Sequence, residues 1–214
     1  MNRFARFLIW TVVVLGVVVV ALRYLLFQSW TIPEDDAWLA ASIAPTLRGG
    51  DTVLVLTRGK PGFGDLARCK DPDDPNTWIV GRIVGLGGDE VEVMGSVLSV
   101  NGKSYVSTEA CEEARFTIQH PDTGSEVELG CSRVELAGSW HFKGSGGQSR
   151  KLGDDKVHKV GEGRVFLLSD NRDVHDDSRD FGAIPADSCD GRVVFRLWSR
   201  DGWNDSKRRF TVIR

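Results

Sequence analysis

The first 27 residues contain an apolar run long enough to cross a lipid bilayer. Phe7–Leu22 carries no charge, and Tyr24–Phe27 continues the run beyond Arg23. A helix over 7–27 would rise about 30 Å, the thickness of the hydrocarbon core of a bilayer. Arg23 lies near the end of the run, where a long side chain reaches the headgroups. The sequence predicts a transmembrane anchor over 7–27, preceded by a cytoplasmic N-terminus at 1–6.

A cleaved signal peptide is the alternative interpretation of this run. The run is longer than the apolar part of most signal peptides, and residues 28–36 contain no small-x-small cleavage site. These features favour a retained anchor. Arg3 and Arg6 precede the run, and the acidic residues 34–36 follow it. This asymmetry predicts a single-pass protein of the cell (inner) membrane, with its main domain on the outer, periplasmic side.

The net charge and the cysteines limit which partners and which cellular compartment are expected. The formal net charge is -3, so there is no electrostatic argument for nucleic acid as a partner. Cys111 and Cys131 flank a polar, hairpin-like region and can pair in an oxidising compartment. Cys69 and Cys189 can also pair or remain buried thiols, because spacing does not choose among the three connectivities. Without a C-x-x-C or H-x-x-H pattern, no structural zinc site is expected.

The chain after the anchor has the pattern of short strands rather than helices. Residues 37–47 form a short apolar stretch, and the Gly-, Pro- and Asp-rich segment 59–77 is typical of a loop. We expect β-strands at 51–57, 78–86, 91–94, 97–100, 165–168 and 192–198. The fold class is therefore predicted as mainly β: an antiparallel β ectodomain. We expect its core at 37–102 and 161–214, with the more polar segment 103–160 as a small inserted β subdomain.

The segment 169–185 reads S-D-N-R-D-V-H-D-D-S-R-D-F-G-A-I-P. Its closely spaced aspartates and arginines permit charge-assisted pairs that would hold a loop rigid. An EF-hand calcium loop does not fit, because counting from either candidate first aspartate puts Phe181 or Ile184 where the bidentate glutamate belongs. His175 has no second histidine or cysteine nearby in sequence, so we expect no metal site here.

Four segments, in this order, resemble the type I signal peptidases (bacterial leader peptidase-like). These are S-I-A-P-T-L at 42–47, G-D-T-V-L-V at 50–55, G-R-I-V-G-L-G-G-D at 81–89, and the segment 169–185. The corresponding family patterns are S-M-x-P-T-L, G-D-x-V-x-V, K-R-V-x-G-L-P-G-D and G-D-N-R-D-x-S-x-D-S-R-x-x-G-x-V-P. The resemblance covers most of the chain, and residues 103–160 contribute little to it.

The resemblance implies a membrane-bound serine endopeptidase that removes signal peptides from exported pre-proteins. It implies Ser42 as the nucleophile and the Ser42 backbone N–H as an oxyanion-hole donor. Two ion pairs, Arg82 with Asp170 and Asp177 with Arg179, would be site scaffold rather than reacting groups. The implied partners are signal peptides with small-x-small cleavage sites and the lipid bilayer. No metal or cofactor is implied, and the oligomeric state stays open.

Three positions depart from the family pattern. The family's general base is the lysine of the third segment, and Gly81 stands there. The family's serine that hydrogen-bonds this lysine is replaced by His175. Many bacterial members carry a hydroxyl two residues before the nucleophile, whereas this chain has Ala40. Glycine cannot take a proton, so the base must come from elsewhere or be absent.

We hypothesise that His175 replaces the lysine as the base for Ser42. A serine hydroxyl needs a base within hydrogen-bond reach, and a neutral imidazole suits that task near neutral pH. If residue 175 faces the lysine site, its ring can fill the space beside Gly81, with Asp176 or Asp177 orienting it. Relatives from the endoplasmic reticulum use a Ser–His pair, although their histidine replaces the lysine itself.

The alternative is a catalytically inactive homologue that binds extended peptides or assists another protease. In that case Ser42 is a relic and His175 a neutral loop substitution. A third possibility is a base supplied by Lys60 or Lys70 from the long loop. The remaining histidines, at positions 120, 141 and 158, lie in or beside the insert and are not expected to react.

Overall fold

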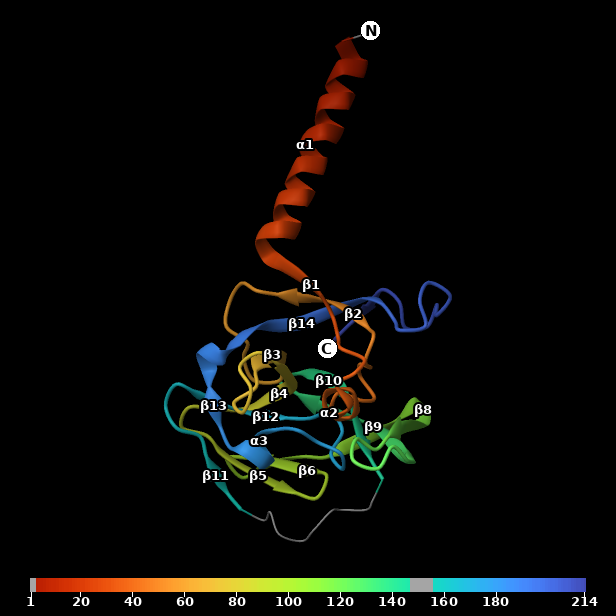
Figure 1. The fold of residues 1–214 in the computed structure, drawn as a ribbon. Helices are drawn as coiled ribbons and strands as arrows, with labels where there is room; N and C mark the ends of the chain where they lie inside the picture. The colour runs from red at the N-terminus through yellow and green to blue at the C-terminus, as the bar shows by residue number, and fades with distance from the viewer. Residues whose placement is uncertain (1–2, 147–155) are drawn as a thin grey trace.

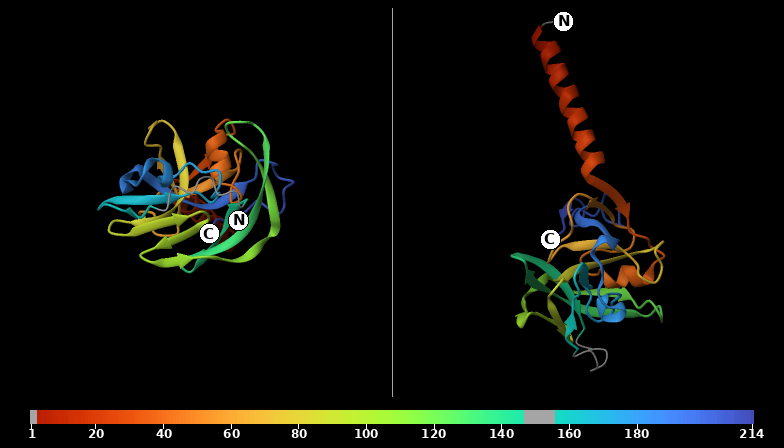
Figure 2. Two further views of the ribbon diagram at one scale, coloured as in Figure 1. Left: turned by 90° about the horizontal axis from the view of Figure 1, so that it is seen from below. Right: turned by 90° about the vertical axis from the view of Figure 1, so that its left-hand side faces the viewer.

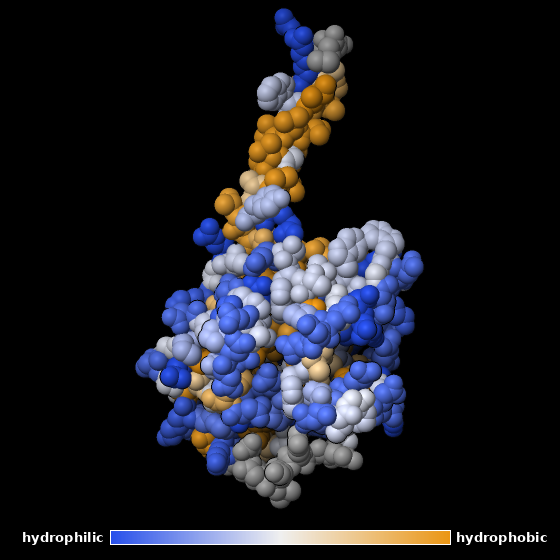
Figure 3. Space-filling model, in the orientation of Figure 1, coloured by the Kyte–Doolittle hydropathy of each residue, from blue (hydrophilic) through white to orange (hydrophobic). Residues whose placement is uncertain are grey.

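The computed structural model describes residues 3–146 and 156–214. It begins with helix α1 (Arg3–Leu26), which projects from the rest of the molecule (Figure 1). Its side chains are almost all exposed, and its 18-residue window reaches a mean hydropathy of 2.5. The space-filling view shows this helix as an apolar rod above a mostly hydrophilic body (Figure 3). By length and composition, α1 can span a membrane.

The main sheet holds strands from both ends of the chain. Its order is β1-β2-β14-β3-β4-β12-β13, all neighbours are antiparallel, and β15 pairs with β14. The strands are β1 (Phe27–Thr31), β2 (Thr52–Leu56), β3 (Leu66–Lys70), β4 (Trp78–Leu86), β12 (Arg164–Leu168), β13 (Ile184–Pro185), β14 (Cys189–Trp198) and β15 (Thr211–Val212). Two of the segments that resemble the signal peptidases, 50–55 and 81–89, therefore contribute strands β2 and β4 to the same sheet, and the segment 169–185 connects its strands β12 and β13.

Two smaller sheets complete the body. One has the order β11-β5-β6-β7, and the other the order β10-β9-β8. Their strands are β5 (Glu90–Met94), β6 (Val97–Val100), β7 (Lys103–Tyr105), β8 (Ser107–Gln119), β9 (Glu126–Leu136), β10 (Ser139–Ser145) and β11 (His158–Lys159). The long strands β8 and β9 curve around one side of the molecule (Figure 2, left).

Strand β4 is buried on both faces and positions the serine segment. Val80 packs in one apolar cluster, whereas Ile79 and Ile83 pack in another on the opposite face. The short helix α2 (Ala37–Ser42) places Leu39 and Ile43 in the Val80 cluster. This burial fixes α2 over the sheet. The remaining helices are α3 (Ser178–Phe181) and a 3-10 turn, η1 (Ala186–Ser188).

The predicted mainly β fold is confirmed, and several short elements were missed, among them α2 and β3. Helix α2 lies in the apolar stretch 37–47, and strand β3 lies in the segment 59–77 that the sequence predicts as a loop. Both pairings that spacing left open appear as disulfides, Cys69–Cys189 and Cys111–Cys131.

The division into core and insert stays a prediction. Within the predicted insert 103–160, strands β8–β10 form their own sheet, whereas β7 and β11 pair with β6 and β5. Residues 147–155 of the insert, like residues 1–2 of the predicted N-terminal segment 1–6, lie outside the described residues.

Candidate functional site

Ser42 is the last residue of α2. The helix begins after Asp36, whose carboxylate accepts a hydrogen bond from the Leu39 N–H at 2.9 Å and so caps its first turn. The Ser42 side chain is 1% exposed, and its Oγ donates to the Leu39 carbonyl at 3.0 Å. The hydroxyl is thus turned back on its own helix and hydrogen-bonded there.

Asn171 attaches the segment 169–185 to this helix. Its backbone N–H donates to the Ser42 carbonyl at 3.0 Å, and its side-chain Nδ2 donates to the Ala41 carbonyl at 2.9 Å. The Asn171 Oδ1 accepts from the N–H groups of Asp173 and Val174, each at 3.1 Å. Val174 also packs in an apolar cluster with Ala41. One buried amide therefore fixes the start of the loop against α2, a role that the sequence did not reveal.

His175 follows directly and is held by a carboxylate of α3. Its Nδ1 lies 2.8 Å from Asp180 Oδ2, whereas the nearest oxygen of Asp177 is 4.0 Å away. The two candidate reacting groups hydrogen-bond to different partners. In the described part of the chain, no hydrogen bond joins Ser42 to His175.

Two buried ion pairs support these segments. Arg82 on β4 donates to both oxygens of Asp170, at 2.7 and 3.2 Å, and Thr46 Oγ1 donates to the same carboxylate at 2.5 Å. Arg179 donates to both oxygens of Asp177, at 2.9 and 2.7 Å. Burial alone would raise the pKa of Asp177, but the charge and hydrogen bonds of Arg179 hold it well below its usual value. Both pairs are bidentate. Arg82–Asp170 joins β4 to the segment after β12, whereas Arg179–Asp177 makes the turn before α3 rigid.

Gly81 lies on β4 opposite Ala67, in a space closed by the neighbouring strand. A Cβ at this position would lie 3.2 Å from the Leu167 Cβ and 3.5 Å from the backbone N and O of Leu168. Leu167 is itself 1% exposed. Aliphatic side chain and backbone, rather than the His175 imidazole, are therefore the nearest neighbours of the position.

The loop around His175 also concentrates negative charge. Burial, followed by the nearby Asp71, Asp180, Asp177 and Asp36, raises the pKa of Asp176 to about 6. Asp36 caps α2, so Asp176 lies in the same electrostatic environment as the start of the serine helix. A carboxyl group with this pKa exchanges its proton close to neutral pH.

The other basic side chains considered from sequence have separate partners. Lys70 lies in β3 rather than in a loop, and its Nζ is 3.7 Å from the centre of the Trp78 ring. His120 lies edge-on to Trp38 with the ring centres 6.5 Å apart, and His158 packs on Phe166. Lys60 lies in the exposed segment between β2 and β3.

His141 lies in a buried cluster behind the Arg82–Asp170 pair. It is 3% exposed, its Nε2 is 4.0 Å from Asp170 Oδ1, and this nitrogen has no hydrogen-bond partner among the described residues. Burial first, and then the charges of Arg82, Arg172 and Lys143, lower the pKa of His141 well below its usual value. Burial likewise lowers the pKa of Arg172 to about 10. His141 is therefore a neutral ring, packed beside the scaffold pair.

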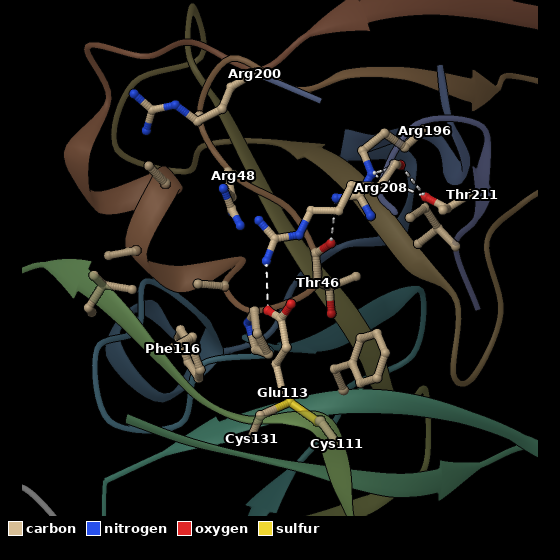
Figure 4. Close-up of a pocket in the computed structure, with 18 of the residues that line it drawn as sticks. Thr46, Arg48, Cys111, Glu113, Phe116, Cys131, Arg196, Arg200, Arg208 and Thr211 are labelled. Atoms are coloured by element: carbon tan, nitrogen blue, oxygen red, sulfur yellow. Dashed lines mark hydrogen bonds and ion pairs between the residues drawn. A yellow bond between two sulfur atoms is a disulfide. The ribbon is translucent and has the colours of Figure 1, made fainter. Parts of the chain in front are cut away.

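A cavity of about 1090 Å³ adjoins the serine segment. It lies between α2, the β8–β9–β10 sheet and the C-terminal residues (Figure 4). Arg48, Arg200 and Arg208 reach into it from one side, and Glu113 lies on the other beside a disulfide. Its lining includes Ala40 and Ala41 but neither Ser42 nor His175. Within the described residues, the cavity therefore does not contain the candidate reacting groups.

One set of side chains has the spacing of a metal site. One ligand atom from each of His175, Asp177 and Asp180 falls within 4.8 Å of the other two. However, both oxygens of Asp177 already accept hydrogen bonds, from Arg179 and from the Ser169 N–H. A metal ion would have to displace a buried, bidentate arginine, so the donor set does not fit one.

Comparisons of the sequence with known proteins indicate its family. The model of the family described as "Signal peptidase, peptidase S26" matches residues 5–198. Signal peptidase I of Aquifex aeolicus is 28% identical over 209 residues, which is 85% of this chain and 79% of that protein. Signal peptidase I of Pseudomonas aeruginosa is 26% identical over 216 residues, covering 89% and 70% of the two chains. Signal peptidase IB of Staphylococcus aureus is 28% identical over 163 residues, 73% of each chain.

Among solved structures, a signal peptidase I from Enterococcus faecalis gives a TM-score of 0.37 at 22% identity, covering 63% of this chain and 97% of that chain. The family assignment rests on the sequence matches. Since the family model extends from α1 to the end of β14, the chain belongs to the signal peptidase family, peptidase S26.

Proposed function

We propose that this protein is a membrane-anchored serine endopeptidase that removes signal peptides from exported pre-proteins. The family and the signal peptidases that resemble it support the reaction class. The proposed roles of Ser42 and His175 rest on one observation: Asn171 attaches the loop that contains His175 to the helix that ends at Ser42. This attachment brings the two candidate reacting segments together from 130 residues apart in sequence.

In the proposed reaction, Ser42 Oγ attacks the carbonyl carbon of the scissile peptide bond while His175 takes the hydroxyl proton. The Ser42 backbone N–H stabilises the oxyanion that forms. His175 then gives the proton to the leaving amine as the carbon–nitrogen bond breaks, and water hydrolyses the acyl-enzyme in the same way. The Ser42 hydroxyl must first leave the Leu39 carbonyl, so substrate binding has to favour a second side-chain rotamer.

The proposed substrate is an extended segment with small side chains in a small-x-small pattern. Such a segment adds as a β-strand beside the site, so that backbone hydrogen bonds supply affinity and shallow pockets select small residues. By the family pattern, Gly81 stands where other members carry their lysine base, and His175 takes over that task here.

The proposed placement in the membrane has α1 spanning the bilayer with its N-terminus in the cytoplasm. Arg3 and Arg6 at the start of α1 and the acidic residues 34–36 after it support this orientation. The two disulfides also support it, because an oxidising outer compartment stabilises them.

A second candidate is an inactive homologue that binds peptides. The surroundings of Gly81 favour it, because the nearest atoms to a Cβ there belong to Leu167 and Leu168 and not to another base. The buried, hydrogen-bonded Ser42 hydroxyl also suits a protein that no longer reacts.

Cleavage of a pre-protein with a small-x-small site by the purified full-length chain tests the two candidates. We expect cleavage by the wild type and its loss in Ser42→Ala and in His175→Ala, with unchanged folding by circular dichroism. A wild type that is inert where the Pseudomonas aeruginosa enzyme cuts contradicts the peptidase and favours the inactive homologue. Full activity in His175→Ala keeps the peptidase but rejects the histidine base.

A further inference from the structure

The hydrogen bond between His175 and Asp180 decides which ring nitrogen is free. The Nδ1 of His175 lies 2.8 Å from Asp180 Oδ2, and the His175 side chain is 19% exposed. An ionised carboxylate only accepts hydrogen bonds. The neutral imidazole must therefore carry its single proton on Nδ1, and the lone pair is left on Nε2.

The carboxylate of Asp180 is itself held by the backbone at the start of α3. Asp180 stands at the third position of α3, and its Oδ2 also accepts from the Asp177 N–H at 3.2 Å. Asp177 completes the capping box from the other side. The oxygen that holds His175 is therefore also held by the capping box of α3.

The neighbouring aspartates do not take this role. Asp177 is 4.0 Å from the ring, and Arg179 and the Ser169 N–H already occupy its two oxygens. In the described residues, no hydrogen bond joins Asp176 to the ring. The sequence suggested these two residues as the orienting group, but the geometry favours the carboxylate five residues after His175.

We propose that Asp180 is the positioning residue of the site, holding His175 in the Nδ1-protonated form so that Nε2 is the atom that accepts the Ser42 proton. This inference rests on the proposed function. The proton moves from Ser42 Oγ to Nε2 as the oxygen–carbon bond forms, and from Nε2 to the leaving nitrogen as the peptide bond breaks. Asp180 keeps its charge throughout and stabilises the imidazolium in between. A lysine base has no tautomers, so this requirement would arise only with the change to histidine.

The tautomer can be measured without any activity. Nitrogen-15 NMR of the histidine-labelled, full-length protein in detergent micelles distinguishes a protonated from an unprotonated ring nitrogen. His175→Gln assigns the signal. We expect Nδ1 protonated and Nε2 unprotonated in the wild type, and a shift toward the Nε2-protonated form in Asp180→Ala. A wild-type His175 that carries its proton on Nε2 overturns the inference.

Asp180→Asn separates orientation from helix capping. Its side-chain oxygen can still accept from the Asp177 N–H, but it carries no charge to stabilise an imidazolium. We expect kcat to fall about 10- to 100-fold with KM nearly unchanged. Asp180→Glu keeps the charge and should recover part of the loss. Asp187→Asn is the matched control, because it removes the same charge from an exposed position in η1 and should leave kcat unchanged.

The outcomes of this inference and of the proposed function are distinguishable. If His175→Ala is inactive while Asp180→Asn keeps full kcat, the histidine base stands and the role of Asp180 is wrong. If His175→Ala keeps full activity, the base assignment fails and the positioning role fails with it. An inert wild type overturns the proposed function, and the measured tautomer still decides whether Asp180 fixes the ring.

Discussion

At the scale of the residue, the atoms around Gly81 leave little room for a side chain. A Cβ there would lie 3.2 Å from the Leu167 Cβ, closer than an ordinary contact, and Leu167 has little room to move in its buried strand. We expect Gly81→Ala to lower the free energy of unfolding by about 1 kcal/mol, because overpacking outweighs the gain from replacing glycine in a strand. Gly81→Lys carries the same contact and should lose at least as much stability.

Denaturant unfolding of the full-length protein in detergent measures this effect. Gly161→Ala is the control, because the nearest atom to its Cβ would be Arg164 Cδ at 3.7 Å, an ordinary contact. An unchanged midpoint for Gly81→Ala would contradict the tight packing. A lysine at this position would likewise require Leu167 to shift.

The raised pKa of Asp176 makes the free energy of unfolding depend on pH. Its pKa is raised to about 6 from 3.8, so the folded state binds a proton more readily than the unfolded chain. Stability from this group therefore falls as pH rises from about 3.8 to about 6, and above pH 6 the folded state holds an unfavourable charge. We expect Asp176→Asn to raise the free energy of unfolding by about 1 kcal/mol at pH 7.5, a value kept small because the carboxyl group is partly exposed.

The same comparison at pH 4 should show almost no gain, because the wild-type carboxyl group is then mostly neutral in the folded state. Unfolding curves at the two pH values measure the difference. Asp187→Asn makes the same charge change at an exposed position and should show no such contrast. An equal gain at both pH values for Asp176→Asn would contradict the raised pKa.

At the scale of the elements, Asn171 joins α2 to the loop before α3. Asn171→Ala leaves the Ala41 carbonyl and the N–H groups of Asp173 and Val174 without partners in a buried region. We expect a loss of about 3 kcal/mol in the free energy of unfolding. Asn171→Asp keeps the acceptor oxygen and loses the donor, so it should fall between alanine and the wild type.

Peptidase assays and unfolding curves on the same preparations measure both consequences of this change. We expect the rate of pre-protein cleavage in Asn171→Ala to fall more than 10-fold at temperatures where the variant stays folded, because the His175 loop is no longer held to α2. Asn204→Ala, in an exposed turn, is the control. A folded Asn171→Ala with the wild-type rate would show that the attachment has no catalytic importance.

The sequence predicted strands made of apolar runs well, but it did not resolve the long polar strands β8 and β9, the helix α2 or the strand β3. The expected strand 78–86 matches β4 because a continuous apolar run with flanking turn residues specifies a buried strand. Helix α2 has six residues, too few for a helical period, and only its Asp36 cap marked it. Strand β3 was missed because it contains Arg68, which pairs with Asp190 on β14 and stacks on Trp78.

The same limit applies to the candidate site. Motif resemblance pointed to Ser42, His175 and both scaffold pairs, because these residues keep a fixed order along the chain. It assigned no role to Asn171, although the family pattern contains this asparagine, or to Asp180; the contacts of both residues are hydrogen bonds made after folding. Local sequence shows an asparagine and an aspartate in a polar loop, and only the tertiary arrangement shows which atoms they hold.

At the scale of the whole molecule, an exposed aromatic cluster lies at the end of the body from which α1 leaves. Trp198, Trp203 and Phe210 have ring centres 5.1 to 5.6 Å apart and are 37%, 59% and 46% exposed. Arg209 lies over the Trp203 ring. The segment between β14 and β15 that carries Trp203 and Phe210 lies near β1 in both side views (Figures 1 and 2). Aromatic rings beside cationic side chains are typical of the bilayer interface.

If α1 spans the bilayer, this cluster should contact lipid headgroups and bring the body close to the membrane surface. We therefore expect brominated lipids to quench part of the tryptophan fluorescence of the reconstituted wild type, and Trp203→Phe to remove a measurable share of that quenching. Trp38→Phe is the control, because Trp38 is also partly exposed, at 36%, but lies on α2 and packs against His120. Equal quenching in Trp203→Phe and the wild type would place the cluster in water. The body would then be tethered to the bilayer by α1 alone, and substrates would have to leave the membrane surface to reach Ser42.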